Sequence, residues 1–456
     1  MNRRLLQRFL RYVKIDTTAR GEIETYPSSP GQLKLGRLLV KELQALGISD
    51  AQQDRYGIVM ATIPATADEA PTIAWCAHLD TSPETTGKDV RPQVVRNYQG
   101  GDLALPASPD RVIRAADNPQ LDALRGRTLI TTDGTTLLGA DDKAGVAVIM
   151  EAAARLMDRG PAQNAPSKGT VPFSLRPSEA CRPKLGQSPQ NRRHGPIRLL
   201  FTCDEEIGRG VDYVAPAQIG AVVCYTLDGQ GTDMIDVETF SADLAVVTIY
   251  GVNIHPSIAK GRMVNAIRVS SDFLGRLPRD RLSPESTEDR EGFLHAYEIQ
   301  GGVGGVKLRI LLRDFDAQKL EDQARFLSQT AEASLREFPG ARITVEIKPQ
   351  YRNMAAGLAG EPRAVAYAQR ALERLARQAK LALVRGGTDG ARLTELGLPS
   401  PNLSCGAYTP HSVLEWACLE QMAESVDWLL ALAEVWAEKQ GASAGACCAR
   451  PTPHSP

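Results

Sequence analysis

Two adjacent carboxylates, Asp141 and Asp142, stand in a glycine-flanked turn within residues 137–145. Neighbouring acids repel each other and are costly to desolvate unless a cation neutralises them, and the flanking glycines let the backbone turn sharply beside an ion. The alternative is a surface turn in which an Asp caps a helix. The hypothesis that Asp141 bridges two metal ions therefore depends on whether other ligands converge on this place.

A histidine and an aspartate follow the apolar run 72–77, which has the length of a buried strand. Ligands in open α/β sheets collect beyond the carboxyl ends of strands. Side chains two residues apart share one face of an extended chain, so Asp80 could fix the tautomer of His78 while the other ring nitrogen binds metal. A buried histidine beside a capping Asp is the ordinary alternative.

Two further apolar runs end in acids. Residues 197–203 lead into the acidic triplet 204–206, and residues 221–227 lead into Asp228. Side chains alternate along a strand, so one Glu could bind metal while its neighbour faces the attacking water. Metal-assisted hydrolysis needs this division between a fixed ligand and a free base. An acidic helix start is the alternative for the triplet, but several strands ending in ionisable side chains favour a shared site.

Another histidine, His411, stands four residues before Glu415. We expect Glu415 to open a long final helix that reaches about Lys439. A histidine just before a helix serves either as a cap or as a ligand, and its position alone does not decide between them.

Composition bounds the class of protein. At 456 residues the chain exceeds one ordinary core, so we expect two domains. Its 53 basic and 54 acidic side chains indicate neither a nucleic-acid partner nor an anionic membrane surface. Arginines interrupt the apolar positions of residues 1–13, which predicts an amphipathic helix and not a secretory signal. No stretch of the sequence is apolar enough over the length needed to predict a membrane span. The eight cysteines lack CxxC spacing, which favours a reducing, cytoplasmic setting.

The hydrophobic pattern predicts an α/β fold with a mostly parallel central sheet, built from residues 1–240 and 352–440. Residues 241–351 predict an inserted, smaller α+β domain. In it we expect strands at 244–250, 306–312 and 343–347 and helices at 264–277 and 315–337. Proline-rich residues 159–196 are expected to form a flexible insertion, and residues 441–456 a disordered tail.

Together these motifs resemble the co-catalytic zinc aminoacylase and carboxypeptidase-like metallopeptidases. The resemblance rests on residues 78–80, 139–145, 204–206, 228–229 and 411–415. More narrowly, residues 78–83, 97–102, 255–261 and 385–391 look like the tripeptide aminopeptidases of that family. The resemblance spans most of the chain apart from the 159–196 insertion.

The resemblance implies two zinc ions per subunit. One ion would be held by His78 and Asp228 and the other by Glu206 and His411, with Asp141 bridging both. Carboxylates and neutral imidazoles suit zinc, and two ions can share the activation of water and of the carbonyl.

The resemblance also assigns the remaining roles. Asp80 would orient His78, and Glu205 would be the general base. His255 would reach from the smaller domain, acting as a lid, to the developing oxyanion. Three residues would grip the carboxylate end of a small peptide substrate: Arg313, Asn353 and Arg385. Dimerisation through the smaller domain is a further expectation from the family.

Two departures from the family pattern stand out. Leu414 occupies a position where close members often have a second histidine, so the metal is assigned to His411 by its spacing from Glu415. Cys203 replaces a usual proline beside the base, which suggests sensitivity to oxidation or thiol reagents. Two alternatives stay open: a dipeptidase or N-acyl amino acid amidohydrolase of the same superfamily, and an inactive peptide-binding homologue.

Overall fold

The computed structural model describes residues 2–158 and 192–438. Most of the predicted 159–196 insertion, and the predicted tail at 441–456, lie outside these residues. The main body contains an eleven-stranded sheet whose four central strands, in the order β8-β3-β9-β16, run parallel. This mixed α/β architecture confirms the predicted fold class.

The strands of the main sheet follow the apolar runs of the sequence. The central strand β3 is buried at every position, because helices cover both faces of a parallel sheet. In sheet order the strands are β1 (Gln52–Gln53), β2 (Val59–Ile63), β8 (Ile197–Thr202), β3 (Ile73–His78), β9 (Val223–Gln230), β16 (Asn402–Tyr408), β17 (Trp416–Cys418), β7 (Leu129–Thr131) and β4 (Gln93–Val95). Off this path lie β10 (Met234–Thr239) and β15 (Lys380–Val384), and β5 (Leu103–Leu105) pairs with β6 (Ser108–Ile113).

The helix α3 (Ala140–Met157) packs against β3, β9 and β16 and contacts α1 (Arg3–Tyr12) and α10 (Leu419–Trp436). Its small residues allow this close approach. A Cβ at Gly145 would lie 2.2 Å from the carbonyl oxygen of Leu227 in β9. The remaining helices of the main body are α2 (Pro30–Ala45), α4 (Pro216–Ile219), α7 (Ala355–Ala359), α8 (Arg363–Arg374) and α9 (Asp389–Glu395).

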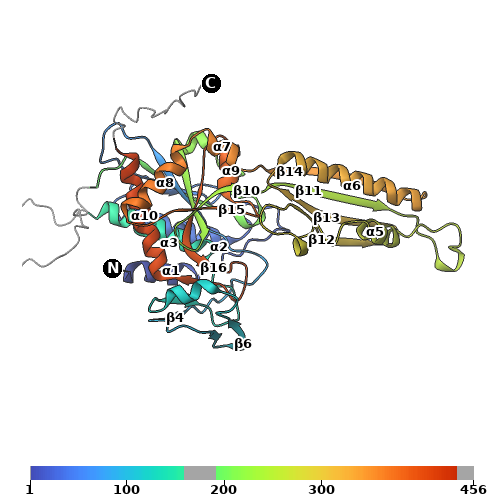
Figure 1. Cartoon of the computed structure of the whole chain (residues 1–456), viewed down its shortest axis with the longest axis horizontal. Helices are drawn as coiled ribbons and strands as arrows, with labels where there is room; N and C mark the ends of the chain where they lie inside the picture. Colours follow the sequence, from blue (N-terminus) through green and yellow to red (C-terminus); the bar gives the residue numbers. More distant parts are fainter. Residues whose placement is uncertain (1, 159–191, 439–456) are drawn as a thin grey trace, which may run out of the picture.

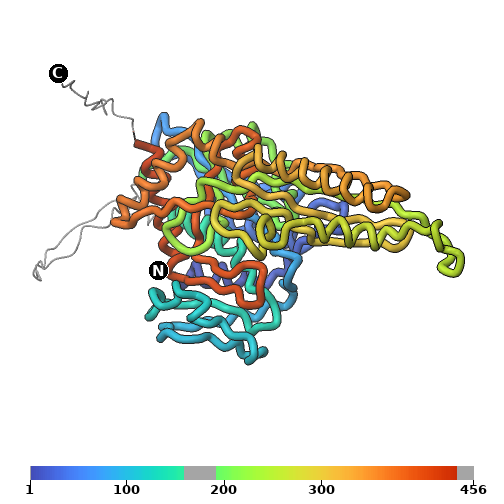
Figure 2. The backbone as a smooth tube through the Cα atoms, turned by 45° about the vertical axis from the view of Figure 1, so that its right-hand side comes forward, coloured from blue at the N-terminus to red at the C-terminus, as the bar shows by residue number. Residues whose placement is uncertain are grey.

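Residues 241–351 form a second sheet with its own apolar cluster, which Figures 1 and 2 show projecting from the main body. We call it the projecting unit. Its antiparallel strands are β12 (Phe293–Gly302), β13 (Gly305–Asp314), β11 (Ser241–Tyr250) and β14 (Arg342–Tyr351), in that order. Two helices, α5 (Ala266–Gly275) and α6 (Ala317–Glu337), cover one face.

Two expectations about these elements were incomplete or wrong. The strand β12 was not predicted, since half of the residues of this edge strand are exposed and only one is buried, so it shows no buried pattern. The prediction that the final helix begins at Glu415 is also wrong, because α10 begins at Leu419. The strand β17 intervenes, because buried Trp416 stacks on Tyr408 and Ala417 pairs with Ile130 of β7. Among the described residues, no helix has the length and apolar character needed to cross a membrane.

A buried carboxylate ties α1 to α3. Glu151 accepts hydrogen bonds from Arg4 at 2.8 and 2.9 Å, from Arg8 at 2.6 Å and from Arg155 at 3.2 Å. Only 2% of the Glu151 side chain is exposed. Although burial opposes ionisation, the hydrogen bond from Arg4 and the neighbouring guanidinium groups lower the pKa of Glu151.

We expect Glu151→Ala to lower the free energy of unfolding by about 3 kcal/mol, because it breaks a buried ion pair and leaves buried Arg8 with only its longer contact to Glu42, at 3.2 Å. Since the folded-state pKa is lowered, the contribution of Glu151 is present at neutral pH and is lost as pH falls through that pKa. Urea unfolding at neutral and acid pH measures both effects.

The matched control is Asp427→Ala, which removes an exposed partner of the same Arg155. It should cost less than about 1 kcal/mol. Equal losses in the two variants would contradict a special role for the buried cluster.

Candidate metal centre

The five predicted metal ligands meet at one edge of the parallel strands. They lie at the end of β3, the start of α3, the turn after β8, the last part of β9 and the loop after β16: His78, Asp141, Glu206, Asp228 and His411. This edge is where ligands bind in open α/β sheets. Segments far apart in the sequence therefore supply one compact cluster.

Asp141 stands between the two histidines. Its Oδ1 lies 2.9 Å from Nε2 of His78, and its Oδ2 lies 3.5 Å from Nε2 of His411. On the first side, Asp228 Oδ1 lies 3.7 Å from the same His78 nitrogen. On the second side, Glu206 Oε2 lies 2.8 Å from Nε2 of His411. The two oxygens of one carboxylate thus face two different histidines.

The cluster has an excess of buried negative charge. Burial, with the nearby Asp141 carboxylate, raises the pKa of Glu206 to about 7 and raises that of Asp228 well above its ordinary value. Burial lowers the pKa of His411, but hydrogen bonding to Asp141 and Glu206 outweighs this effect and raises that pKa to about 11. The carboxylates therefore favour positive charge at the histidine positions, as expected of a site built for cations.

One buried acceptor fits a metal directly. Oε1 of Glu206 is buried and has no hydrogen-bond partner among the described residues. An unpaired buried oxygen is costly unless a cation or donor reaches it. His78, Asp141 and Glu206 offer ligand atoms that all lie within 4.8 Å of one another.

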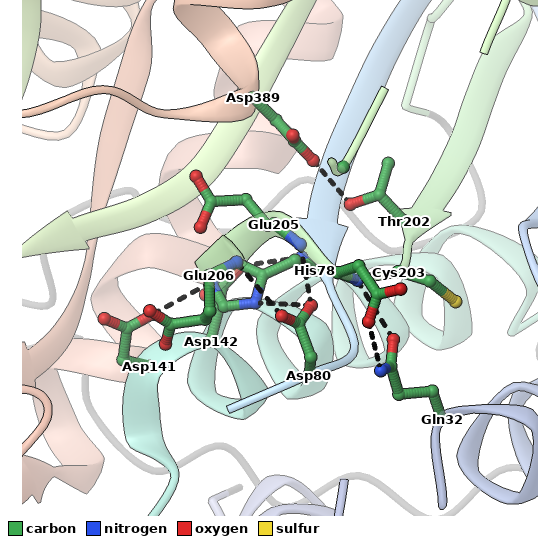
Figure 3. Close-up of polar contacts among 12 residues, drawn as sticks. Gln32, His78, Asp80, Asp141, Asp142, Thr202, Cys203, Glu205, Glu206 and Asp389 are labelled. Carbon is green, nitrogen blue, oxygen red and sulfur yellow. Dashed lines mark hydrogen bonds and ion pairs between the residues drawn. The ribbon is translucent and has the colours of Figure 1, made fainter. Parts of the chain in front are cut away.

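Asp80 connects His78 to the segment that carries the predicted base. Its Oδ1 lies 3.4 Å from Nδ1 of His78, and its two oxygens accept the backbone N–H groups of Glu205 at 3.1 Å and Glu206 at 3.0 Å. Figure 3 shows Asp80 beside the imidazole and below Glu205. One carboxylate thus positions a candidate ligand and the candidate base together.

The prediction that the acidic triplet 204–206 alternates along a strand is wrong. A turn places these residues instead. β8 ends at Thr202, Asp204 adopts a left-handed φ of 62°, and residues 205–207 form a 3-10 turn. Burial raises the pKa of Glu205 well above its ordinary value. Within the described residues, no hydrogen bond holds the Glu205 carboxylate.

Arg385 contacts the projecting unit. It donates to the carbonyl and hydroxyl oxygens of Thr287 at 2.6 and 2.8 Å and to the carbonyl oxygen of Glu291 at 3.0 Å. Its guanidinium carbon lies 5.6 Å from the ring centroid of Phe240 and 5.7 Å from that of Phe293. The predicted carboxylate grip is therefore engaged with protein groups in this arrangement.

The other predicted substrate residues also have protein partners. Asn353 accepts from the backbone N–H of Thr239 and donates to the carbonyl of Phe315, where the chain passes between the two sheets. Arg313 donates to the carbonyl oxygens of Leu312 and Asp243. The exposed His255 lies 2.7 Å from the hydroxyl of Ser257. Among the described residues, none of these side chains hydrogen-bonds to a candidate ligand.

Comparison with known proteins decides the family. The profile of "Peptidase family M20/M25/M40" matches residues 184–435. Peptidase T of Geobacillus thermodenitrificans is 39% identical over 440 residues, which cover 96% of this chain and all of the relative. Peptidase T of Bacillus subtilis is 37% identical over 435 residues, covering 95% and 98%. The chain belongs to the M20/M25/M40 peptidase family.

Solved structures share the fold. The aminopeptidase PepT from Bacillus cereus matches with a TM-score of 0.69 at 23% identity, covering 96% of this chain and 99% of that one. A dinuclear metal-binding M20 peptidase from Bacillus subtilis matches with a TM-score of 0.59 at 15% identity, covering 95% and 98%.

Sequence reasoning named two buried acids of this M20 chain, Glu415 and Asp142, but did not find their role, which is to accept backbone N–H groups around Asp141. Oε2 of Glu415 accepts the N–H groups of Leu138 at 2.8 Å and Gly139 at 2.6 Å, and Oε1 accepts that of Asp141 at 2.9 Å. Asp142 accepts the N–H of His78 at 3.1 Å. Asp142 also lies close to His78 and Asp228, but both its oxygens already accept backbone N–H groups. Only the acidic character of these residues was visible in the sequence.

Cys203 differs from the expectation of a sensitive thiol in this M20 site. It is fully buried, and burial raises its pKa well above the ordinary value. Figure 3 shows its sulfur pointing away from Asp141. Because the thiolate is the reactive form, this environment protects the side chain.

We expect Cys203 to resist iodoacetamide in the folded protein and to react after denaturation. Mass spectrometry of the peptide that contains Cys203, before and after unfolding, measures this. Rapid labelling of Cys203 in the native state, with a parallel loss of activity, would restore the expectation of a sensitive site.

Proposed function

We propose that this chain is a two-metal aminopeptidase that releases the N-terminal residue from tripeptides. The observation that carries the proposal is the placement of Asp141, with one oxygen toward His78 and the other toward His411. The nearly full-length similarity to proteins named peptidase T supports the substrate class.

Zinc fits the donor set best. Two imidazoles and three carboxylates suit this ion, and the unpaired Glu206 oxygen supports its presence. His78 and Asp228 would hold one ion and Glu206 and His411 the other, with Asp141 shared. When bound, the ions supply Lewis acidity toward water and the scissile carbonyl.

Glu205 is the proposed general base. It takes a proton from the water that attacks the carbonyl carbon, and it returns a proton to the leaving nitrogen as the C–N bond breaks. Burial raises the pKa of Glu205 well above its ordinary value, which strengthens it as a base. The hydrogen bond from its backbone N–H to Asp80 fixes the segment from which it acts.

Substrate binding requires the projecting unit. We propose that His255 stabilises the oxyanion and that Arg313, Asn353 and Arg385 bind the peptide carboxylate, with the unit acting as a lid. We also propose a cytoplasmic enzyme that pairs with a second copy through this unit. Exposed Tyr297 and Ile299 on the edge strand β12 support that pairing.

Glu205→Ala should lower kcat by about 10²–10⁴-fold while both ions stay bound, because a base is lost and no ligand is removed. Metal analysis and a tripeptide assay on the same preparation measure this. The exposed Asp212, which pairs with Arg209, provides the control variant Asp212→Ala, expected to keep wild-type turnover. Near-normal turnover in Glu205→Ala would reassign the base.

A free tripeptide should be cleaved faster than a dipeptide, and an N-acetylated tripeptide should resist cleavage. Product analysis by mass spectrometry identifies the released residue. Turnover of the blocked peptide would favour an amidohydrolase instead. Peptide binding without hydrolysis in excess zinc would indicate an inactive homologue.

A further inference from the structure

The strand β9 changes register at Asp228. Against the parallel strand β16, Thr226 pairs with Asn402 and Gly229 pairs with Ser404. Three steps along β9 thus match two steps along β16, so β9 carries one extra residue between these pairs. An extra residue of this kind is a β-bulge, which leaves a ladder group unpaired and re-aims a side chain.

The side chain of Asn402 fills the gap in the ladder. Its Oδ1 accepts the backbone N–H of Asp228 at 3.0 Å and the hydroxyl of Thr226 at 2.8 Å. Asn402 is 1% exposed, so water does not compete for these bonds. A Cβ on Gly229 would lie 2.8 Å from the carbonyl carbon of Leu403, and glycine therefore lets the two strands approach closely enough at this point.

A second buried acid fixes the orientation of the Asn402 amide. Asp236 pairs with Asn402 across the antiparallel strands β10 and β16, and its Oδ2 accepts the amide Nδ2 at 2.8 Å. An amide has a donor end and an acceptor end. Because Asp236 holds the donor end, the oxygen of Asn402 must face Asp228.

We propose that Asn402 and Asp236 are positioning residues for the candidate metal ligand Asp228. Asp236 orients Asn402, Asn402 holds the backbone of the bulge, and the bulge aims the Asp228 carboxylate at the side of the site that contains His78. The inference rests on the proposed two-ion site. It adds an outer layer, made of strand side chains, to one half of that site.

The test removes the acceptor of the bulge and then restores it. The variant Asn402→Leu is close in size to the wild type but leaves the Asp228 N–H without its acceptor. Titration calorimetry of the metal-free full chain with Zn²⁺ should show one ion bound about 10–100-fold more weakly, with the other retained. The variant Asn402→Asp again places an oxygen where it can accept the Asp228 N–H, and it should return the affinity toward the wild-type range.

The control is Ser400→Ala, which removes a buried hydrogen bond of 2.7 Å to Leu398 just before β16. It should lower Tm without changing Zn²⁺ affinity. If Asn402→Leu fails to fold, Asp236→Ala serves in its place and should weaken the same ion. Wild-type binding of both ions by the folded Asn402→Leu or Asp236→Ala variant, or binding by Asn402→Asp as weak as that by Asn402→Leu, would overturn the inference. Failure of the wild type to bind two ions would overturn the proposed function itself.

Discussion

The structure depends on the neutralisation of acids that lie together at the end of a buried parallel sheet. Removing a carboxylate from water costs several kcal/mol even after a protein relaxes around it. This cost applies to Asp141, Glu206 and Asp228, which lie together at this centre. Among the described residues, the groups that hydrogen-bond or pair with their side chains are His78 and His411. These carboxylates raise the pKa values of His78 and His411, so that protonated histidines can replace cations in part. Divalent cations satisfy the same oxygens with more charge and leave the imidazoles neutral.

The acids around this centre divide by what their oxygens contact. Asp80, Asp142 and Glu415 accept backbone N–H groups, so each of them fixes a turn. Asp204 does the same for the segment before α2, accepting the N–H of Ser28 at 2.7 Å. The acids whose oxygens remain open toward the centre are the candidate ligands and the candidate base. The first group determines the geometry of the second.

This division explains what could be predicted from the sequence. Apolar runs that end in ionisable residues predicted a common site, because parallel strands bring their carboxyl ends to one edge. The sequence could not say which member of an adjacent pair turns inward. Asp142 accepts the backbone N–H groups of His78 and nearby Gly145. Asp141 instead turns toward the imidazoles of His78 and His411, which come from distant segments. Asn402 and Asp236 carried no signal at all, since their role depends on a register shift between two strands that are far apart in the chain.

The join between the two sheets places a constraint on catalysis. Arg385 is held by Thr287 and Glu291, and Arg290 of the same loop forms an ion pair at 2.7 Å with Glu238 of β10. A guanidinium that uses its N–H groups on backbone oxygens cannot offer the same groups to a carboxylate in a bidentate pair. If Arg385 binds the end of a peptide, the loop at 287–291 must therefore give way. The charge-assisted bond to substrate would be stronger than the bonds to neutral carbonyls that it replaces. Binding energy from the far end of a tripeptide could then be used to reposition the projecting unit over the metal centre, a step that a shorter peptide would drive less well.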